Sequence, residues 1–306
     1  METKLKIQES KKKLCCPICG NTESTLFANE KLDQEKVTEF TYASRKNPEY
    51  MCMKLVECTE CELVYAQTPP DQGFLSSAYA SANYDSDEEA HSAARTYAKY
   101  LKKELTGMKI RNLAIDVGAG NGALLPRLQE LGFADAIGVE PSRAAIAAAP
   151  EIVKRKLIEG MFTKELLSEM HPNLICSFMT LEHITEPKQF LKTAYDILEP
   201  NGRVAVVVHN RDGKLNKFLG LKSPIIDIEH LQLFNPVSAV KLLESAGFKS
   251  VKVTRLINTY SVKYWLRLCP AGQIKQSLQK LLHILYLDRI EISIPVGNIF
   301  VVGIKE

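Results

Sequence analysis

Short apolar runs alternate with amphipathic segments over the second half of the chain. Runs such as 111–118 (RNLAIDVG) and 203–209 (RVAVVVH) have the length and apolar content of buried strands. The segment 188–198 (KQFLKTAYDIL) places its apolar residues on one side of a helix. Because strands and helices alternate, the pattern predicts an α/β fold, with a mostly parallel sheet covered by helices on both faces.

The last part of the chain continues this pattern and then interrupts it. A helix is predicted at 235–247, followed by strands at 250–257 and 298–306. Between the two strands lies an insert, residues 259–290, whose run 273–287 is amphipathic. The apolar residues that share one face of that run are Ile274, Leu278, Leu281, Leu282 and Leu285. We therefore expect a helical insert between the last two strands.

The N-terminal part lacks such periodicity. Residues 15–65 form a polar stretch around two cysteine pairs and cannot build a hydrophobic core alone. Residues 68–85, rich in Pro, Ser, Ala and Tyr, indicate a connector. Ser86 and Glu89 have capping-box spacing and would open a helix that stops near Gly107. The predicted domains are a module at 1–66, a connector and helix at 67–107, and a large domain at 108–306.

The composition is that of a folded globular protein. Of 306 residues, 39 are Lys or Arg and 36 are Asp or Glu, which gives a net charge of +3. This balance produces no strongly basic surface, so a nucleic acid partner is disfavoured. The first 14 residues lack the apolar segment of a secretory signal, and no apolar run reaches the ~20 residues that span a bilayer. We expect a cytoplasmic protein without a membrane span.

Six of the eight cysteines precede residue 62. Because cytoplasmic thiols stay reduced, paired cysteines are better explained by a metal than by disulfides. Cys16 with Cys19 and Cys58 with Cys61 form two Cys-x-x-Cys knuckles, which together can complete a tetrahedral zinc site. Zinc would then replace a missing core, although contact with substrate stays open, and a redox role lacks a thioredoxin-like context. The other cysteines are predicted to be spare (Cys15 and Cys52) or buried thiols (Cys176 and Cys269).

A glycine-rich loop stands where a buried strand turns into a helix. It reads Asp116-Val-Gly118-Ala-Gly120-Asn-Gly122. Glycines let the backbone approach a ligand, and the N-terminus of the following helix offers N–H groups to an anion. Gly118, Gly120 and Ala123 also match the G-x-G-x-x-A fingerprint of dinucleotide sites. The loop alone therefore leaves two kinds of cofactor open.

Two carboxylates near the loop bear on that choice. Asp116 would face the pyrophosphate of a dinucleotide, whereas S-adenosylmethionine brings an ammonium and a sulfonium that suit an acid. Glu140 ends the next strand, where its two oxygens can accept hydrogen bonds from the ribose hydroxyls of either cofactor. Asp116 thus favours S-adenosylmethionine.

Five segments in order resemble the successive motifs of class I S-adenosylmethionine-dependent methyltransferases. They are DVGAGNG, VEPS, LEHITEP, EPNGRVAVVV, and EHLQLFNP followed by LLESAGF. The resemblance covers roughly two-thirds of the chain. It implies a Rossmann-like sheet of seven strands, mostly parallel with the last strand antiparallel, and S-adenosylmethionine as the cofactor.

The same resemblance implies a cofactor site assembled from several loops. Asp116 would hold the ammonium, the loop glycines the methionyl end and Glu140 the ribose, while the connector would close over the site with Tyr79 and Tyr84. The residues implied to bind the cofactor are Asp116, Gly118, Gly120, Gly122, Glu140, Met161 and Phe162, of which the last two would line the adenine.

The segments CPICG and CTECELVY are similar to the N-terminal zinc-binding domain of sugar methyltransferases. Two departures affect the substrate side. Pro172-Asn173-Leu174-Ile175 lacks the aspartate that the family often has in its fourth strand, and His209-Asn210 replaces a Pro-Asn pair. Sugar C-methyltransferases of this kind also carry a longer C-terminal domain. The resemblance therefore does not secure sugar C-methylation.

Methyl transfer to a hydroxyl or amine needs one well-placed base. His183 follows the fourth strand, at the carboxyl edge of the sheet where open α/β folds bind ligands, and is the first candidate. The alternative is that His183 contacts cofactor or packs locally. His230 is the second candidate, because the family brings its segment over the substrate pocket, and His209 is the third. Glu182 with His183 also resembles pairs that hold a divalent metal in related O-methyltransferases.

These observations favour methyl transfer from S-adenosylmethionine to a small-molecule acceptor, a nucleotide-sugar or other glycan precursor above all. One alternative is an RNA methyltransferase that grips nucleic acid with the zinc module, which a contiguous Lys/Arg face beside the pocket would support. Another is a non-catalytic protein that keeps the cofactor fold for binding. We expect structural zinc held by Cys16, Cys19, Cys58 and Cys61, and catalysis by His183 or His230.

Overall fold

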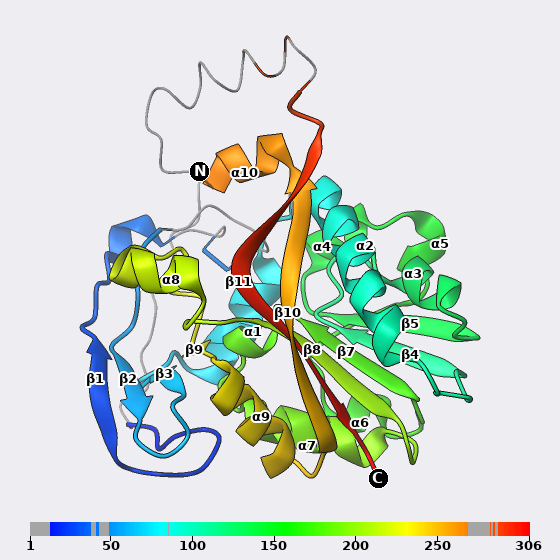
Figure 1. Cartoon of the computed structure of the whole chain (residues 1–306), viewed down its shortest axis with the longest axis horizontal. Coiled ribbons are helices and arrows are strands. Elements are labelled where there is room, and N and C mark those ends of the chain that lie inside the picture. The colour runs from blue at the N-terminus through cyan, green and yellow to red at the C-terminus, as the bar shows by residue number, and fades with distance from the viewer. Residues whose placement is uncertain are drawn as a thin grey trace.

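The computed structural model describes residues 13–37, 41–42, 49–84, 86–268, 282, 284 and 287–306. Cys269 and most of the run 273–287, which was predicted to be helical, lie outside these residues. The described residues form one sheet of seven strands and one of four (Figure 1).

The larger sheet has the strand order β10-β11-β8-β7-β4-β5-β6. Its strands are β4 (Leu113–Val117), β5 (Asp135–Glu140), β6 (Leu157–Glu159), β7 (Leu174–Phe178), β8 (Arg203–His209), β10 (Lys249–Ser261) and β11 (Glu291–Ile304). Neighbours from β6 to β8 pair in parallel, whereas β11 runs antiparallel to both β8 and β10. The predicted fold class is confirmed, including the antiparallel last strand.

Helices cover both faces of this sheet, because successive residues of a strand point to opposite sides. In β8, Val204, Val206 and Val208 belong to one hydrophobic core, and Ala205 and Val207 belong to the other. The helices of the first core are α6 (Lys164–Leu167), α7 (Pro187–Ile197) and α9 (Pro236–Ser245), and those of the second are α2 (Asp87–Glu104), α3 (Leu125–Glu130) and α5 (Glu151–Lys154) (Figure 1).

The shorter elements connect these layers. They are the helices α1 (Gln72–Ser81), α4 (Arg143–Ala148), α8 (Lys214–Leu219) and α10 (Val262–Leu268), with the 3-10 turns η1 (Gln34–Lys36), η2 (Leu181–His183) and η3 (Gly220–Lys222). Of these, η2 and α8 follow the carboxyl ends of β7 and β8 directly, which places both elements at the edge of the sheet where ligands of such folds bind.

The smaller sheet is antiparallel and is shared between the two parts of the chain. Its strands, in order, are β1 (Ser24–Ala28), β2 (Leu55–Cys58), β3 (Val64–Ala66) and β9 (Gln232–Leu233). The strand β9 follows β8 in the chain, and it pairs with β3 through Val64↔Leu233 and Tyr65↔Gln232. The large domain therefore supplies the edge strand of the N-terminal sheet.

Further contacts bind the N-terminal module to the large domain. Arg211 forms an ion pair with Glu57 at 2.5 Å, and the Asn235 amide donates to Glu62 at 2.8 Å. Residues of β2 and β3 share a hydrophobic core with the segment 225–233. This packing forms one hydrophobic core that extends across the predicted domain boundary at residue 66.

The predicted connector is largely helical. Helix α1 begins after Asp71, whose carboxylate accepts hydrogen bonds from Gly73 N at 2.8 Å and Phe74 N at 3.3 Å. Its residues Leu75 and Ala78 are buried in the same core as the N-terminal strands. The cap and the buried positions together explain why this stretch folds as a helix.

The predicted capping box at Ser86 and Glu89 is wrong. Helix α2 begins at Asp87, and the buried Ser86 side chain makes no cap hydrogen bond. A capping box instead opens α9, where the Asn235 side chain accepts from Ser238 N at 2.8 Å and Ser238 Oγ accepts from Asn235 N at 2.9 Å. Ser86 is nevertheless the N-cap residue of α2, so the spacing located the start of the helix but not the hydrogen bond.

Gly122 occupies a position that excludes a side chain. Its φ of +72° is left-handed, and a Cβ atom there would lie 2.4 Å from Val153 Cγ1. Gly107, after α2, has a similar φ of +82° but no neighbour within 4 Å of such an atom. Substitutions at the two glycines can therefore distinguish the energetic cost of backbone strain from that of steric overlap.

We expect Gly122→Ala to lower the free energy of unfolding by about 1–3 kcal/mol more than Gly107→Ala. Both variants carry the left-handed strain, about 1–2 kcal/mol, but only Gly122→Ala must displace Val153. Urea denaturation of the two variants measures the difference. Equal losses would show that Val153 moves aside freely.

Candidate functional site

The four predicted zinc ligands come together in the structure. The sulfur atoms of Cys16, Cys19, Cys58 and Cys61 all lie within 4.8 Å of one another. The shortest separations are 3.3 Å between Cys16 and Cys61 and 3.5 Å between Cys19 and Cys58. A disulfide needs about 2.05 Å, whereas tetrahedral zinc with Zn–S bonds of about 2.3 Å places its sulfurs somewhat under 4 Å apart. The cluster is compatible with zinc.

The thiols of the cluster differ in how readily they ionise. The Glu60 backbone N–H points to Cys58 Sγ at 3.4 Å. The Cys61 thiol, next to Cys16, lowers the pKa of Cys16 to about 5, although burial works in the opposite direction. The hydrogen bond with Cys16 and burial raise the pKa of Cys61, and burial raises the pKa of Cys19. Of the spare cysteines, Cys15 is exposed and Cys52 is buried away from the cluster. A metal bound here would cross-link the turn between β2 and β3 to the first cysteine pair.

Three of the four clustered cysteines lie in the protein interior and Cys19 is exposed, and none of the four belongs to the wall of the large cavity. Cys16, Cys58 and Cys61 are buried together with Leu63 and Tyr65, in the core that also holds α7 and α9. None of the four cysteines lines the cavity described next. Their position fits a folding role for a bound metal.

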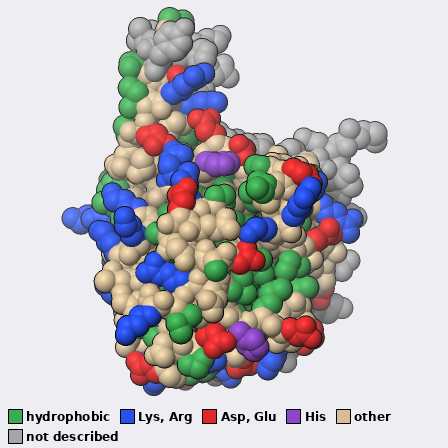
Figure 2. Space-filling model, turned by 90° about the vertical axis from the view of Figure 1, so that its right-hand side faces the viewer, with side chains coloured by type: hydrophobic (Ala, Val, Ile, Leu, Met, Phe, Trp, Pro, Cys, Tyr) green, Lys and Arg blue, Asp and Glu red, His purple; other side chains and the backbone are tan. Residues whose placement is uncertain are grey.

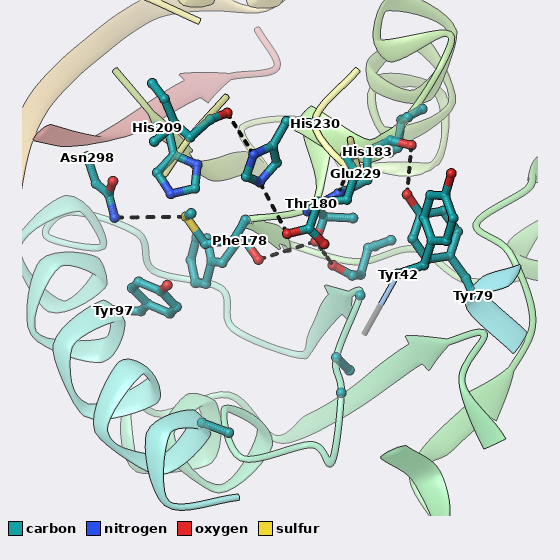
Figure 3. Close-up of a pocket in the computed structure, with 18 of the residues that line it drawn as sticks. Tyr42, Tyr79, Tyr97, Phe178, Thr180, His183, His209, Glu229, His230 and Asn298 are labelled. Carbon is teal, nitrogen blue, oxygen red and sulfur yellow. Dashed lines mark hydrogen bonds and ion pairs between the residues drawn. The ribbon is translucent and has the colours of Figure 1, made fainter. Parts of the chain in front are cut away.

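A cavity of about 860 Å³ opens at the carboxyl ends of the central strands. Its wall includes the glycine loop after β4 and Glu140 at the end of β5. It also includes residues that follow β7 and β8, among them Thr180 and His183 (Figure 3). Its volume lies in the upper part of the range for ligand pockets, roughly 300 to 1,000 Å³. The cavity therefore has room for a large cofactor and a second molecule.

One half of the cavity contains the predicted cofactor residues. Those that line it are Asp116, Gly118, Gly120, Glu140, Met161 and Phe162. Gly122 does not line the cavity but packs against Val153, so the structure gives it a role in the turn. Tyr79 also lines the cavity, whereas Tyr84 lines a separate small cavity together with Glu140. The cofactor contacts of all these residues stay predictions.

Glu140 is fixed by the backbone on both sides. Its Oε2 accepts from Gly120 N at 2.7 Å, and its Oε1 accepts from Ser142 N at 2.8 Å. Burial raises the pKa of this carboxyl, and the two N–H groups partly oppose that effect. A carboxylate has about four acceptor sites, so two remain for ribose hydroxyls. The geometry fits the predicted cofactor.

Three histidines follow one another along the wall of the other half (Figure 3). The ring centroids of His183 and His230 lie 5.1 Å apart, and those of His230 and His209 lie 5.0 Å apart. His183 Nδ1 is 2.9 Å from the Glu229 carbonyl, and His230 Nδ1 is 2.9 Å from the Ile225 carbonyl. The structure thus gathers all three predicted base candidates in one place.

The side chain of Glu182 lies beside His209 at the end of β8. Its side chain is fully buried, and its Oε1 lies 2.9 Å from His209 Nδ1 and accepts from His209 N at 2.5 Å. Burial opposes ionisation of Glu182, but the charges of His209 and His183 outweigh it and hold its pKa below the ordinary value. The described residues bring ligand atoms together for a metal at the four cysteines alone.

Sequence reasoning missed several residues of the cavity wall. Tyr260 and Trp265 line it from β10 and α10, and their rings pack at 5.3 Å. Asn298 Nδ2 donates to Asn258 Oδ1 at 3.0 Å, and both side chains are buried in the wall. The available signal was a polar residue within each of the apolar runs LINTY and GNIFVV. A buried asparagine in such a strand needs a partner, which points to a site.

The face of the molecule shown in Figure 2 supplies little support for a nucleic acid interface. Figure 2 shows Lys and Arg side chains interspersed with Asp and Glu over the face it presents, and no single-sign band is visible there. Among the described residues, no helix combines the length and the apolar character needed to cross a membrane.

The chain matches known proteins through the larger sheet. A family described as "Methyltransferase domain" matches residues 87–253. The ubiquinone biosynthesis O-methyltransferase of Bradyrhizobium diazoefficiens is 32% identical over 104 residues, which cover 33% of this chain and 41% of that protein. The mitochondrial ubiquinone biosynthesis O-methyltransferase of Dictyostelium discoideum is 27% identical over 159 residues, which cover 47% of this chain and 48% of that protein.

The chain therefore spans less than half of the length of these curated relatives. Among solved structures, the plantazolicin methyltransferase BpumL, in complex with monoazolic desmethylPZN analog and SAH, aligns with a TM-score of 0.48. It is 20% identical, and the alignment covers 78% of this chain and 91% of that one.

We expect about one zinc per chain, held by the four clustered cysteines. Cys61→Ser should lose the metal and lower the melting temperature, because the bound metal substitutes for core in this module. Cys15→Ser is the matched control, since Cys15 is exposed and outside the cluster. Elemental analysis and thermal denaturation of protein purified without chelator measure both effects. Metal-free wild-type protein, or full metal content in Cys61→Ser, would contradict the assignment.

We also expect the Glu182 carboxylate to stabilise the fold in a pH-dependent way. Because its folded pKa is lowered, the contribution is fully present above the unfolded value of about 4.3 and is lost as the pH falls through the folded pKa. The stability difference between wild type and Glu182→Gln should therefore shrink as the pH is lowered from about 6 to 3. Thermal melts across that range test this, with Glu159→Gln, an exposed carboxyl, as the control.

Proposed function

The chain belongs to the methyltransferase domain family and is an S-adenosylmethionine-dependent methyltransferase, and we propose that it methylates a hydroxyl group of a small, ring-bearing molecule. The family match covers residues 87–253, more than half of the chain, and includes the glycine loop, Glu140 and all three histidines. The acceptor class is the part that we infer.

One observation carries the proposal: a single cavity joins the predicted cofactor loop to the three histidines. S-Adenosylmethionine supplies an electrophilic methyl group when bound. The chain's own residues must then place a nucleophile against it and receive the proton that the nucleophile loses. A cluster of imidazoles beside the cofactor half suits a hydroxyl, whose proton must be removed.

The composition of the acceptor half supports a ring-bearing molecule. Tyr42, Tyr79, Tyr260 and Trp265 line this wall together with apolar residues such as Ile225. Aromatic side chains stack on flat rings and on the apolar faces of sugars alike. The printed names of the two curated relatives describe O-methyltransferases, which is consistent with a hydroxyl acceptor.

A sugar acceptor, such as a nucleotide-sugar or glycan precursor, remains the second candidate. The four-cysteine cluster favours it, because CPICG and CTECELVY resemble the zinc-binding domain of sugar methyltransferases. Methyl transfer from labelled S-adenosylmethionine to catechol, to a UDP-sugar and to transfer RNA separates the classes. Labelling of transfer RNA alone would replace both candidates by the RNA methyltransferase.

We propose that Glu140 holds the ribose of the cofactor and that Asp116 and the loop glycines hold its methionyl end. Glu140→Ala should weaken S-adenosylmethionine binding at least about tenfold, because each lost charged hydrogen bond is worth about 1.5–3 kcal/mol. Glu159→Ala, at the paired position of β6 but exposed, should bind normally. Isothermal titration calorimetry measures both constants. Preferred binding of NAD, or unchanged affinity in Glu140→Ala, would refute the cofactor assignment.

A further inference from the structure

Two asparagines form a buried polar pair in the part of the cavity wall that β10 and β11 supply. Asn258 and Asn298 are 2% and 3% exposed, and both line the cavity. Leu256 and Phe300, two positions away on the same strands, belong to the hydrophobic core on the side of α2. The alternation along both strands therefore predicts apolar side chains at the two positions. Asparagine there costs stability unless its polar atoms are paired.

The pairing of these two side chains is incomplete. Asn298 Nδ2 donates to Asn258 Oδ1 at 3.0 Å and lies 4.0 Å from Met179 Sδ. The nitrogen end of the Asn298 amide is therefore turned toward the protein. The other end, Asn298 Oδ1, has no hydrogen-bond partner among the described residues. Because nearly all buried carbonyl groups have a partner, this oxygen is expected to receive one from a molecule bound in the cavity.

An irregularity in the strand pairing brings the asparagines to the cavity. Between the pairs Leu256↔Asn298 and Asn258↔Ile294, the chain advances by two residues on β10 but by four on β11. The extra residues of β11 form a bulge, in which Gly297 has a left-handed φ of +98°. Bulges next to binding sites redirect side chains. Pairing of β11 with β8 reaches only to Asn298, so the bulge lies at the carboxyl end of β8, where the cavity opens.

The asparagine pair belongs to the acceptor half of the cavity. In the sheet, β8 and β7 separate β11 from β4, the strand that leads into the glycine loop. Three strand spacings amount to about 14 Å. Figure 3 shows Asn298 on the side of His209, across the cavity from Tyr42 and Tyr79. A partner for Asn298 Oδ1 is therefore expected on the methyl acceptor.

The chemistry of an amide restricts what this partner is. An amide carbonyl accepts a hydrogen bond but takes up no proton at neutral pH. A group that is bound at Asn298 Oδ1 therefore keeps its hydrogen, whereas the hydroxyl that is methylated must lose its own. The two groups have to be different parts of the acceptor.

Resting on the proposed function, we propose that Asn298 recognises a second hydroxyl on the ring of the methyl acceptor and that Asn258 fixes the orientation of the Asn298 amide. The second hydroxyl donates to Asn298 Oδ1 and is unchanged by the reaction. The site then selects molecules with two ring hydroxyls, a chemistry that catechols and sugars share. An analogue without the second hydroxyl leaves the buried carbonyl unpaired, and sites of this kind discriminate strongly against such analogues.

The first experiment measures selectivity as the ratio of kcat/KM values. The probe acceptors are two pairs that differ in one hydroxyl: catechol with 2-methylphenol, and resorcinol with 3-methylphenol. Wild-type protein should favour the dihydroxy member of at least one pair about 10- to 100-fold, because the methyl analogue leaves a buried carbonyl unsatisfied. The double variant Asn258→Leu/Asn298→Leu should abolish this preference. Ile294→Leu, on the same strand and in the same wall, should keep it.

The second experiment needs no acceptor. Replacing both partners of a buried hydrogen bond by apolar groups of similar shape is nearly neutral or stabilising. We therefore expect the double variant to melt at the wild-type temperature or above it, whereas Asn298→Leu alone leaves Asn258 Oδ1 unpaired and should melt at a lower temperature. If the pair serves only to hold β10 against β11, the double variant will instead melt at a lower temperature and keep the selectivity of wild type.

These outcomes separate the asparagine pair from the proposed function. A chain that binds S-adenosylmethionine but methylates none of the four probes refutes the phenolic hydroxyl acceptor. Saturation-transfer NMR on the complex with S-adenosylhomocysteine then decides on the pair by comparing the binding of the same probes. A wild-type protein without preference in either pair of probes, or the same preference in wild type and double variant, would overturn the inference. If the double variant does not fold, the selectivity of Asn298→Ala, which removes the carbonyl alone, decides in the same way.

Discussion

The candidate site depends on a two-residue strand, β9, that the large domain contributes to the N-terminal sheet. β9 pairs with β3, and the residue just before it, Leu231, donates its N–H to the Glu182 carbonyl at 2.7 Å. His230 and Glu229 precede Leu231 directly, and Glu229 supplies the carbonyl beside His183. The cysteine cluster holds the turn that leads into β3. A metal there would therefore stiffen the wall of the cavity without touching its contents.

The cavity wall combines a cluster of imidazoles with acidic side chains, because Asp227 and Glu229 line the same cavity. The ring centroids of neighbouring histidines lie about 5 Å apart. The fully buried Glu182 lies 2.9 Å from the ring of His209. Tyr79 adds no charge, because burial raises its pKa well above the ordinary value, and its hydroxyl donates to the His183 carbonyl at 3.4 Å.

The sequence predicted those features that short segments encode. The strand and helix alternation fixed the class of the fold, and the two Cys-x-x-Cys pairs identified atoms that the structure brings within 4.8 Å. The sequence assigned both His183 and His230 to the pocket, because the family motifs that contain them indicate where each lies in the fold. In the structure their rings are neighbours. Such patterns can be read from the sequence because each depends on a few residues that are close together along the chain.

Features that arise from distant parts of the chain were not predictable. β9 has two residues, too few to show any periodicity, and its pairing depends on a partner far back in the sequence. Glu182 was associated with its neighbour His183, yet the fold turns it to His209 at the end of another strand. For Gly122, which was predicted to bind the cofactor, the sequence did not show that a side chain there would overlap Val153. In each case the deciding contact is tertiary.

The shared strand also has a consequence for how the chain is made. Asn235, just after β9, bonds to Glu62, just before β3, across 173 residues of sequence. A ribosome adding roughly 5 to 20 residues per second takes on the order of 10 to 35 s to cover that interval. During this time β3 presents an unpaired edge, which is a template for pairing with other nascent chains. Early metal capture by the cysteines would shorten the exposed flexible segment, so zinc supply would influence the yield of folded protein during synthesis more than its activity afterwards.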